Sequence, residues 1–274
     1  MAQLLTGKRT HFIRSPIVAS VHAPTLLELG VCSDPGPARS CNEDRWQADP
    51  AQGLFMLADG MGGAGAGEVA SETVLSGFSG DARAGLDAGM TPAESLVRAG
   101  VQAHARVLAA ARAQPECLGM GSTLVAAMLT ERTLTVAHVG DSRAYVMRDG
   151  VLTRLTEDHS VMQELVQAGR ISAARGRRNV SKGPLTRVLG VTDLAPVVQV
   201  CEADWQSNDL LLLCTDGLSD ALDGDELGCA LTRLLNATHH DLNLTAQGLV
   251  TAALSAGCRD NVTVLITTAL HPAR

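Results

Sequence analysis

The sequence of 274 residues predicts an α+β fold, a four-layer α-β-β-α sandwich with two central antiparallel sheets flanked by helices. Several short strands are apolar on both faces, as in segment 53–58, so each needs cover on both sides. Links between successive strands are too short for crossover helices, which indicates antiparallel pairing. Longer amphipathic segments supply the outer helices, and strands and helices do not alternate regularly.

Seven segments are short, apolar and bordered by turn residues, which is typical of strands. They lie at 26–33, 53–58, 122–129, 133–139, 143–148, 209–214 and 262–268. The three segments between residues 122 and 148 follow one another closely, so we expect them to form one antiparallel meander. Asp149 and Gly150 come next, and this pair is typical of a tight hairpin turn.

Five segments have apolar residues at helical spacing. They lie at 68–78, 91–113, 161–168, 225–235 and 245–256. The second begins with Thr91-Pro92-Ala93-Glu94, which supplies an N-cap, a proline in the first turn and a capping-box glutamate. No repeat or low-complexity linker divides the chain. We therefore interpret residues 25–274 as one domain and residues 1–24 as a flexible basic arm.

The composition excludes several classes of partner. The chain carries 29 acidic and 22 basic residues, and its net charge of −7 argues against binding to nucleic acid or to an anionic membrane. Seven scattered cysteines without C-x-x-C spacing are typical of reduced thiols, so we expect a cytoplasmic protein. No apolar run approaches the roughly 18 residues that cross a bilayer, so we expect no membrane insertion. We also expect a monomer.

Aspartates beside a glycine follow three of the apolar segments, namely Asp59, Asp141 and Asp216. A fourth aspartate, Asp260, immediately precedes the segment 262–268. Turn chemistry explains any one of them, but stacked sheets can bring four strand ends together. Converging carboxylates need a cation, and oxygen ligands select Mg²⁺ or Mn²⁺. Two such ions that share a carboxylate would form a hydrolytic site.

The segment Arg39-Ser40-Cys41-Asn42-Glu43-Asp44 adds a guanidinium group able to bind phosphate, together with two more carboxylates. A competing motif is G-x-G-x-x-G at residues 60–65, with Asp81 where a ribose-binding acid would lie. In that case Asp59 would sit against an incoming pyrophosphate, and no parallel alternation of strands and helices follows. The sequence therefore favours the metal site.

Short motifs follow one another in a fixed order from about residue 28 to residue 269. They are Ser33-Asp34-Pro35-Gly36 with Arg39 and Asn42-Glu43-Asp44, Ala58-Asp59-Gly60-Met61-Gly62-Gly63 with Gly67-Glu68, Gly121-Ser122-Thr123-Leu124, Val139-Gly140-Asp141-Ser142-Arg143-Ala144-Tyr145, Leu155-Thr156-Glu157-Asp158-His159-Ser160, Leu185-Thr186-Arg187-Val188-Leu189-Gly190, Cys214-Thr215-Asp216-Gly217-Leu218-Ser219-Asp220 and Gly257-Cys258-Arg259-Asp260-Asn261-Val262-Thr263. This series resembles the metal-dependent serine/threonine protein phosphatases of the type 2C class, most closely their bacterial branch. One motif alone is weak, whereas the complete ordered series is highly specific.

The resemblance implies two central antiparallel sheets flanked by helices and a core site with two Mn²⁺ or Mg²⁺ ions. Asp59 matches the carboxylate that bridges the two ions, and Gly60 matches the residue whose backbone carbonyl binds one of them. Asp216 and Asp260 match ligands of the other ion. Asp141 resembles the aspartate that binds a third, looser ion in bacterial relatives.

Glu43 and Asp44 match acids that hold metal-bound waters, and Asp44 is the one expected to orient the nucleophile. Arg39 matches the phosphate-binding arginine. The resemblance thus implies hydrolysis of phosphoserine and phosphothreonine in proteins by a metal-activated water, which would reverse the action of a bacterial serine/threonine kinase. The expected partners are phosphorylated proteins, namely such a kinase and its targets.

The segment 170–187 carries six basic residues and no acid, and by position it resembles the flap beside the family's active site. We interpret it as a basic collar that attracts phosphorylated segments, and a solvated basic loop is the alternative. Two other functions stay open, namely a catalytically weak binding module with the same fold and a hydrolase of small phosphoesters. The complete set of acids counts against the binding module.

Overall fold

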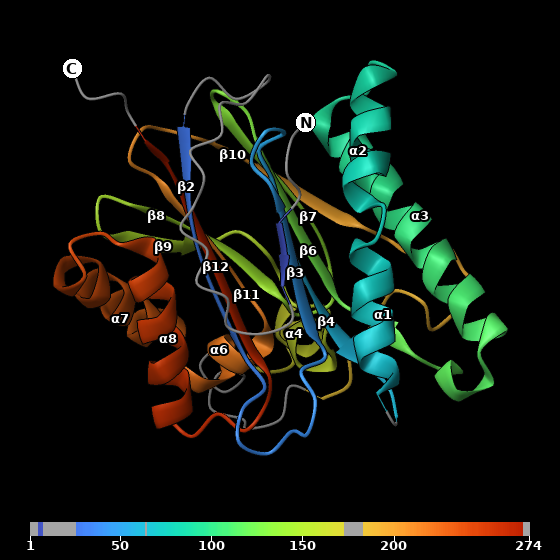
Figure 1. Ribbon diagram of the computed structural model, residues 1–274. Coiled ribbons are helices and arrows are strands. Elements are labelled where there is room, and N and C mark those ends of the chain that lie inside the picture. Colours follow the sequence, from blue (N-terminus) through green and yellow to red (C-terminus); the bar gives the residue numbers. More distant parts are fainter. Residues whose placement is uncertain (1–4, 8–25, 64, 173–182, 271–274) are drawn as a thin grey trace.

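The computed structural model describes residues 5–7, 26–63, 65–172 and 183–270, which form two antiparallel sheets stacked between helices (Figure 1). The predicted four-layer sandwich is confirmed. Within the described residues, the first sheet has the strand order β1 (Leu5–Gly7), β3 (Asp44–Asp49), β4 (Leu54–Met61), β6 (Leu124–Leu129), β7 (Thr133–Val139) and β10 (Gln199–Asp204), with β5 (Gly121–Ser122) paired to β4. The second has the order β2 (Leu26–Asp34), β12 (Val262–Leu270), β11 (Leu210–Cys214), β8 (Arg143–Arg148) and β9 (Val151–Arg154).

Helices cover the outer face of each sheet (Figure 1). The first sheet is covered by α1 (Ala66–Leu75), α2 (Phe78–Asp87) and α3 (Pro92–Ala113), and the 3-10 turn η1 (Pro115–Cys117) follows. The second sheet is covered by α6 (Asp216–Ala221), α7 (Gly224–Ala237) and α8 (Leu242–Ser255). The short helix α4 (Val161–Gln167) lies across a cavity from α6.

The side chains of β4 pack on two sides at once, as their double apolar pattern predicts. Phe55 and Leu57 lie in the core between the two sheets, whereas Leu54 lies in a second core under α1–α3. On β11, Leu213 faces the central core and Leu212 packs under α6–α8. All these side chains are fully buried, and each stabilises the fold by about 1.5–3 kcal/mol. The three cores thereby hold the strand ends in place.

The expected three-strand meander between residues 122 and 148 was wrong in its third strand. β6 and β7 pair in the first sheet, but β8 pairs with β9 and β11 in the second. The turn between β7 and β8 passes through Gly140 at a φ of 102°, which favours glycine, and carries the chain to the other sheet. The hairpin at Asp149 and Gly150 is confirmed, with φ values of 50° and 79°.

Other elements escaped prediction because their sequences lack the usual apolar pattern. β3 is buried along its whole length and yet carries Asp44, Arg45, Gln47 and Asp49. The structure also contains β9, β10 and the short α6, which were not predicted from the sequence. The helix expected at 68–78 ends at Leu75, and α2 begins after Gly77, whose φ of 76° breaks the helix. The capping box predicted at the start of α3 is present.

The dinucleotide-binding alternative is contradicted by the sheet. β4 has antiparallel neighbours on both sides, β3 and β6, whereas that motif requires a βαβ unit. Asp81 forms an ion pair with Arg106 on α3 instead of facing the glycine-rich turn. In the part of the chain that the structure describes, every helix is too short or too polar to cross a membrane.

Two predicted segments are described only in part. Within the expected N-terminal arm, residues 5–7 form β1 and pair with residues 46–48 of β3. The rest of residues 1–24 lies outside the described residues, as does the centre of the basic segment, residues 173–182, with Arg175, Arg177, Arg178 and Lys182.

Candidate metal centre

Asp44 and Asp59 lie opposite each other at one end of the first sheet. Asp44 is the first residue of β3, Asp59 lies near the end of β4, and the antiparallel register pairs them. Residues opposite each other on neighbouring strands have Cβ atoms about 4.5–5.5 Å apart and share a face of the sheet. Since Asp44 is only 1% exposed, these two carboxylates share a site that is shielded from water on the β3 side.

Three other predicted acids lie at neighbouring strand ends. Asp216 begins α6, with only Thr215 between it and β11. Asp260 is separated by only Asn261 from β12, the antiparallel neighbour of β11. Asp141 lies in the turn between β7 and β8 and is buried. Burial raises the pKa of the Asp59 carboxyl well above its ordinary value, and negative charges nearby raise it further, from Asp44, Asp216, Asp141 and Asp260. The structure therefore brings five of the predicted site residues together.

The carboxylate of Asp44 has one oxygen held and one oxygen left over. Its Oδ2 accepts hydrogen bonds from the hydroxyl groups of Thr263 at 2.7 Å and Thr215 at 2.8 Å. Its Oδ1 is buried and has no hydrogen-bond partner among the described residues. Burial raises the pKa of Asp44 from 3.8 to about 7, although the two hydroxyl groups oppose that shift. A buried carboxylate oxygen of this kind needs a ligand, and a cation or its water meets that need.

Glu43 and the backbone carbonyl of Gly60 face the same small space beside Gly67. A Cβ atom on Gly67 would lie 2.5 Å from Glu43 Oε1 and 2.8 Å from Gly60 O, so only glycine leaves this space open. The Gly67 N–H also donates to the Glu43 carboxylate, which lowers its pKa, but burial outweighs this and raises the pKa overall. Gly60 needs to be glycine too, because its own Cβ would lie 1.9 Å from Gly67 O. The Glu43 carboxylate and the Gly60 carbonyl oxygen are both ligands that a hard cation such as Mg²⁺ prefers.

Arg39 lies on the loop between β2 and β3 at the edge of this site. Its Nη2 donates to Asp260 Oδ2 at 2.7 Å, and the two side chains are 49% and 44% exposed. This hydrogen bond and the Asp260 charge raise the pKa of Arg39 further above its ordinary value. The arginine therefore reaches the centre, and its ion pair is exposed enough to exchange one acidic partner for another.

The crowded carboxylates of this centre fit a site for divalent cations. Carboxylates that crowd together repel unless opposite charge lies between them. In the described residues, no three Asp, Glu, His or Cys side chains are grouped so as to hold an ion by themselves. Mg²⁺-type ions need only one or two carboxylates, because waters and backbone oxygens fill their other positions. The orphaned Asp44 oxygen and the space beside Gly67 match that kind of ligand set.

Hydroxyl groups that orient the acids were not assigned roles from the sequence. Thr263 Oγ1 lies 2.7 Å from Ser33 Oγ, which in turn accepts from Asn42 Nδ2 at 2.8 Å. On the other side, Thr123 Oγ1 accepts from the Asp59 N–H at 3.0 Å. Thr123 and Thr263 are buried at the ends of apolar strands. A buried hydroxyl group in such a place needs a polar partner, and this was the signal in the sequence.

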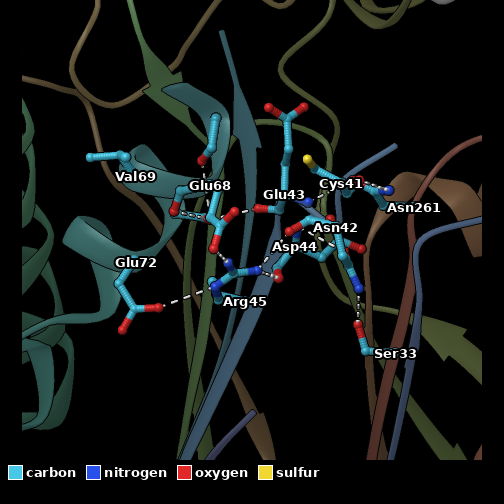
Figure 2. Close-up of polar contacts among 12 residues, drawn as sticks. Ser33, Cys41, Asn42, Glu43, Asp44, Arg45, Glu68, Val69, Glu72 and Asn261 are labelled. Atoms are coloured by element: carbon cyan, nitrogen blue, oxygen red, sulfur yellow. Dashed lines mark hydrogen bonds and ion pairs between the residues drawn. The ribbon is translucent and has the colours of Figure 1, made fainter. Parts of the chain in front are cut away.

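Arg45 is a second residue that the sequence did not single out. Figure 2 shows its guanidinium between Glu68 and Glu72 of α1 and the backbone beside the site, with Nη2–Glu68 Oε1 at 2.6 Å and Nε–Glu72 Oε2 at 3.1 Å. Its Nη1 donates to Asn42 O at 2.8 Å and to Asp44 O at 2.6 Å. Arg45 thus fastens the start of β3 to α1.

Asn261 ties the loop before β3 to the second sheet. Its Oδ1 accepts from the Glu43 N–H at 2.8 Å, and its Nδ2 donates to Cys41 O at 3.0 Å (Figure 2). The same Nδ2 also donates to Pro35 O at 2.8 Å. The amide follows Asp260 directly in the sequence. Asn261 therefore couples the position of Glu43 to that of Asp260.

An open cavity of about 1050 Å³ adjoins the centre. Arg39, Asp216 and Asp260 lie on its wall, and further walls come from β8, β9, α4 and the start of α7. A ligand can therefore reach the acids from solvent. The openness of this approach suits a reacting group carried by a larger molecule.

Comparisons with known proteins agree with this geometry. The family model described as Protein phosphatase 2C matches residues 35–262. The serine/threonine protein phosphatase PstP of Mycobacterium tuberculosis is 36% identical over 249 residues, which are 88% of this chain and 45% of that protein. The serine/threonine phosphatase stp of Listeria monocytogenes is 35% identical over 240 residues, which are 85% of this chain and 92% of that protein. The chain thus spans less than half the length of the mycobacterial relative.

A solved structure gives the same result in three dimensions. The crystal structure of the catalytic domain of PstP in complex with 2 manganese ions matches this chain with a TM-score of 0.74 and 33% sequence identity. The match covers 89% of this chain and 99% of that one.

Proposed function

The chain belongs to the protein phosphatase 2C family, and from that premise we propose that it is a metal-dependent phosphatase that hydrolyses phosphoserine and phosphothreonine in proteins. One observation carries the proposal: four other aspartates crowd the charge of Asp59 at one end of the stacked sheets. Such a group remains ionised near neutral pH only with cations bound. Arg39, at the edge of the same site, supplies a contact for phosphate.

The residues present fit two Mn²⁺ or Mg²⁺ ions in the core site. Asp59 would be shared between the ions, the Gly60 carbonyl would join it on one ion, and Asp216 and Asp260 would hold the other. Asp141 would hold a third, looser ion. When bound, such ions lower the pKa of water and stabilise negative charge on phosphoryl oxygens.

The chain's own side chains orient the reactants. Asp44 can orient the attacking water through Oδ1, because two buried hydroxyl groups already hold its Oδ2. Glu43 directs its carboxylate into the space beside Gly60, where it can hold a water in turn. Arg39 exchanges Asp260 for the phosphoryl oxygens, since an exposed ion pair contributes only about 0–1 kcal/mol. Its planar fork binds two such oxygens at once.

Access and charge favour phosphorylated protein segments as substrates. The cavity beside the centre is open and large, and both relatives carry the name of serine/threonine phosphatases. The basic segment 170–187 would attract phosphorylated chains. The proposal includes a single catalytic domain over residues 25–274, a monomeric and cytoplasmic protein, and a signalling role against a serine/threonine kinase.

Asp59→Asn tests the proposed function. The metal-depleted protein should hydrolyse neither an aryl phosphate nor a phosphothreonine peptide, and Mn²⁺ or Mg²⁺ should restore both activities. Asp59→Asn should lower the metal-supported rate about 1000-fold or more, because the shared ligand is lost. Release of inorganic phosphate is the measurement.

Asp204→Asn is a matched control, because Asp204 is exposed at the end of β10 opposite Thr133. This variant should keep the rate of the unchanged protein. Turnover that survives both metal removal and Asp59→Asn would contradict the proposal. Hydrolysis of the aryl phosphate without any hydrolysis of phosphopeptides would instead indicate a hydrolase of small phosphoesters.

A further inference from the structure

The cavity beside the metal centre has a second charged wall on β8 and β9. Arg143 and Arg154 extend from these neighbouring strands toward one acid, Asp158. Arg143 Nε and Nη2 donate to the two oxygens of Asp158 at 2.9 and 2.6 Å. Arg154 Nη2 donates to Asp158 Oδ1 at 2.5 Å. The Asp158 carboxylate therefore accepts hydrogen bonds from two guanidinium groups. The cluster of Arg143, Arg154 and Asp158 has a net charge of about +1.

Arg154 is the arginine of the pair that has hydrogen-bonding capacity to spare. Its Nε is buried and has no hydrogen-bond partner in the described part of the chain. Its side chain is 31% exposed, whereas that of Arg143 is 14% exposed and also donates to the Tyr145 hydroxyl at 3.3 Å. Burial and the neighbouring Arg143 charge lower the pKa of Arg154. A cation held next to another cation gains from any anion that enters the cavity.

Ser219 on α6 provides a second, independent donor in the same cavity. The residue is only 6% exposed, yet its Oγ has no hydrogen-bond partner among residues 5–7, 26–63, 65–172 and 183–270. A buried hydroxyl group left in this way is less stable than one that is hydrogen-bonded. A ligand oxygen in the cavity would satisfy it.

These donors border the proposed catalytic site. The register of β8 and β11 places Arg143 opposite Cys214, two residues before Asp216, and Ser219 lies one turn further along α6. All of these residues except Cys214 line the one cavity. A peptide with its phosphate held beside Arg39 at the proposed metal centre would therefore carry its neighbouring side chains along this wall.

The opposite wall carries acids, and these help to define where an anion can bind. Asp220, Asp223 and Asp225 line the side formed by α6 and α7. Asp223 is engaged as the N-cap of α7, because its Oδ1 accepts the N–H groups of Asp225 and Glu226, both at 3.0 Å. An anion is thus repelled from the α7 side and attracted to the β8–β9 side.

We infer that the wall formed by Arg143, Arg154 and Ser219 is a second anion subsite, which binds a carboxylate or phosphate group on a substrate residue that flanks the phosphorylated serine or threonine. The inference rests on the proposed function, because it concerns the substrate of that site. The chemistry required is an oxygen-rich anion that accepts hydrogen bonds from a guanidinium group and a hydroxyl group. Both an acidic side chain and a second phosphorylated residue have it.

Phosphothreonine peptides with one variable flanking residue test this subsite in the metal-loaded protein. In one series a single glutamate is moved through the positions before and after the phosphothreonine, in a second series phosphoserine takes its place, and in a third glutamine does. At one or two positions the glutamate or phosphoserine peptide should be hydrolysed with a kcat/KM about 10-fold above that of its glutamine counterpart. Comparing the first two series identifies which anion the subsite prefers.

Arg154→Gln should abolish that preference, and Arg154→Lys should keep part of it because the charge remains. Ser219→Ala should weaken it without affecting the fold, since the hydroxyl has no bonded partner within the described residues to lose. The control Arg83→Gln changes the net charge equally at an exposed position of α2 and should leave the preference intact. For Arg154→Gln, the rates with aryl phosphate and glutamine peptides should stay within about 2-fold, a difference of less than 0.5 kcal/mol.

The outcomes separate cleanly. Phosphopeptide hydrolysis with no preference for an acidic neighbour, or a preference that survives in Arg154→Gln and Ser219→Ala, overturns the subsite while the proposed function stands. Equal loss of activity on all substrates in Arg154→Gln shows that the arginine acts on the fold alone, which also overturns the subsite. If aryl phosphate is hydrolysed and no phosphopeptide is, the proposed function fails and the subsite fails with it.

Discussion

Asp44 shows how a single side chain is prepared for chemistry. Its Oδ2 is held by Thr215 and Thr263, so its Oδ1 points in a direction that the surrounding hydroxyl groups determine. Burial makes the charged carboxylate less stable, and the two hydrogen bonds recover part of that loss. A cation or its water bound to Oδ1 would stabilise the charged carboxylate further. Asp44 is therefore destabilising when it is charged and has no partner, and it is also the residue proposed to orient the attacking water.

Thr263→Val tests this orientation with almost no change in side-chain volume. The variant should lower kcat about 10- to 100-fold, because a hydrogen bond to a charged group contributes about 1.5–3 kcal/mol. The affinity for Mn²⁺, measured by calorimetry, should fall as well, since Asp44 is then free to rotate. Thr263→Ser restores the hydroxyl group and should recover most of both quantities.

Thr267→Val is the matched control on the same strand. Thr267 is equally buried, but its hydroxyl donates to Glu28 O at 2.7 Å, away from the site. This variant should be destabilised without a specific loss of kcat or Mn²⁺ affinity. Equal kinetic effects from the two variants would show that the hydroxyl of Thr263 does not orient Asp44.

At the scale of elements, the site depends on how β3 and α1 are joined. The glycines at positions 60 and 67 let the start of α1 approach the end of β4 more closely than any Cβ atom allows. Arg45 then bonds to Glu68 and Glu72 on the helix and to the backbone on either side of Glu43. The contacts that join β3 to α1 thus also hold the candidate ligands Glu43 and Asp44 in place.

Arg45→Met tests this connection. The side chain of Arg45 is only 4% exposed, and its loss leaves two backbone carbonyl groups without their buried donor. The free energy of unfolding should fall by about 2–4 kcal/mol, measured by urea titration. Glu72→Gln removes only an exposed partner and should change it by about 0–1 kcal/mol. A loss for Arg45→Met as small as that of Glu72→Gln would contradict the proposed role.

At the scale of the whole molecule, the net charge of −7 hides an uneven distribution. Five aspartates gather at one end of the stacked sheets, where the charges of Asp44, Asp216, Asp141 and Asp260 act on Asp59. Four arginines line the adjoining cavity, namely Arg39, Arg143, Arg154 and Arg259. Because the carboxylates come from both sheets, their repulsion opposes the packing of the sandwich itself until cations bind.

The metal-depleted protein should accordingly lose stability as the pH rises. The ordinary pKa of an aspartate is 3.8, and in the folded protein the pKa of Asp44 is raised to about 7. The pKa of Asp59 is raised as well. The folded state therefore binds protons more tightly than the unfolded state, and stability falls between about pH 4 and pH 7 as these protons leave. Thermal unfolding in a chelator, followed by circular dichroism, should show Tm decreasing across this range.

Added Mn²⁺ should raise Tm most at the upper end of the range, since protons compete with the metal. Asp44→Asn should flatten the pH dependence of the metal-depleted protein, and Glu131→Gln on the exposed β6–β7 turn should leave it unchanged. A Tm that rises with pH in the metal-depleted protein, or an equal slope in Asp44→Asn, would contradict this account of the acidic centre.

Much of the fold could be predicted because its signals are local. The double apolar pattern of β4, the capping box of α3 and the Asp149-Gly150 turn all depend on neighbouring residues, and each is present. β3 could not be found in this way, because it is buried along its whole length and yet carries polar residues, and its Arg45 finds its acidic partners on α1. The sheet to which β8 belongs was also beyond reach, since a turn at Gly140 does not say which strand it leads to.

The sequence by itself determined which residues we propose to carry the chemistry: aspartates beside glycines at strand ends, with Arg39 and two more acids on a nearby loop. Only the tertiary structure decided how those residues are used. The hydroxyl groups on Asp44, the brace at Arg45 and the pair Arg143 and Arg154 join positions that lie on different strands or sheets. The physical reason is range, because turn and strand propensities act within a few residues, whereas burial and charge act between whichever elements the packing brings together.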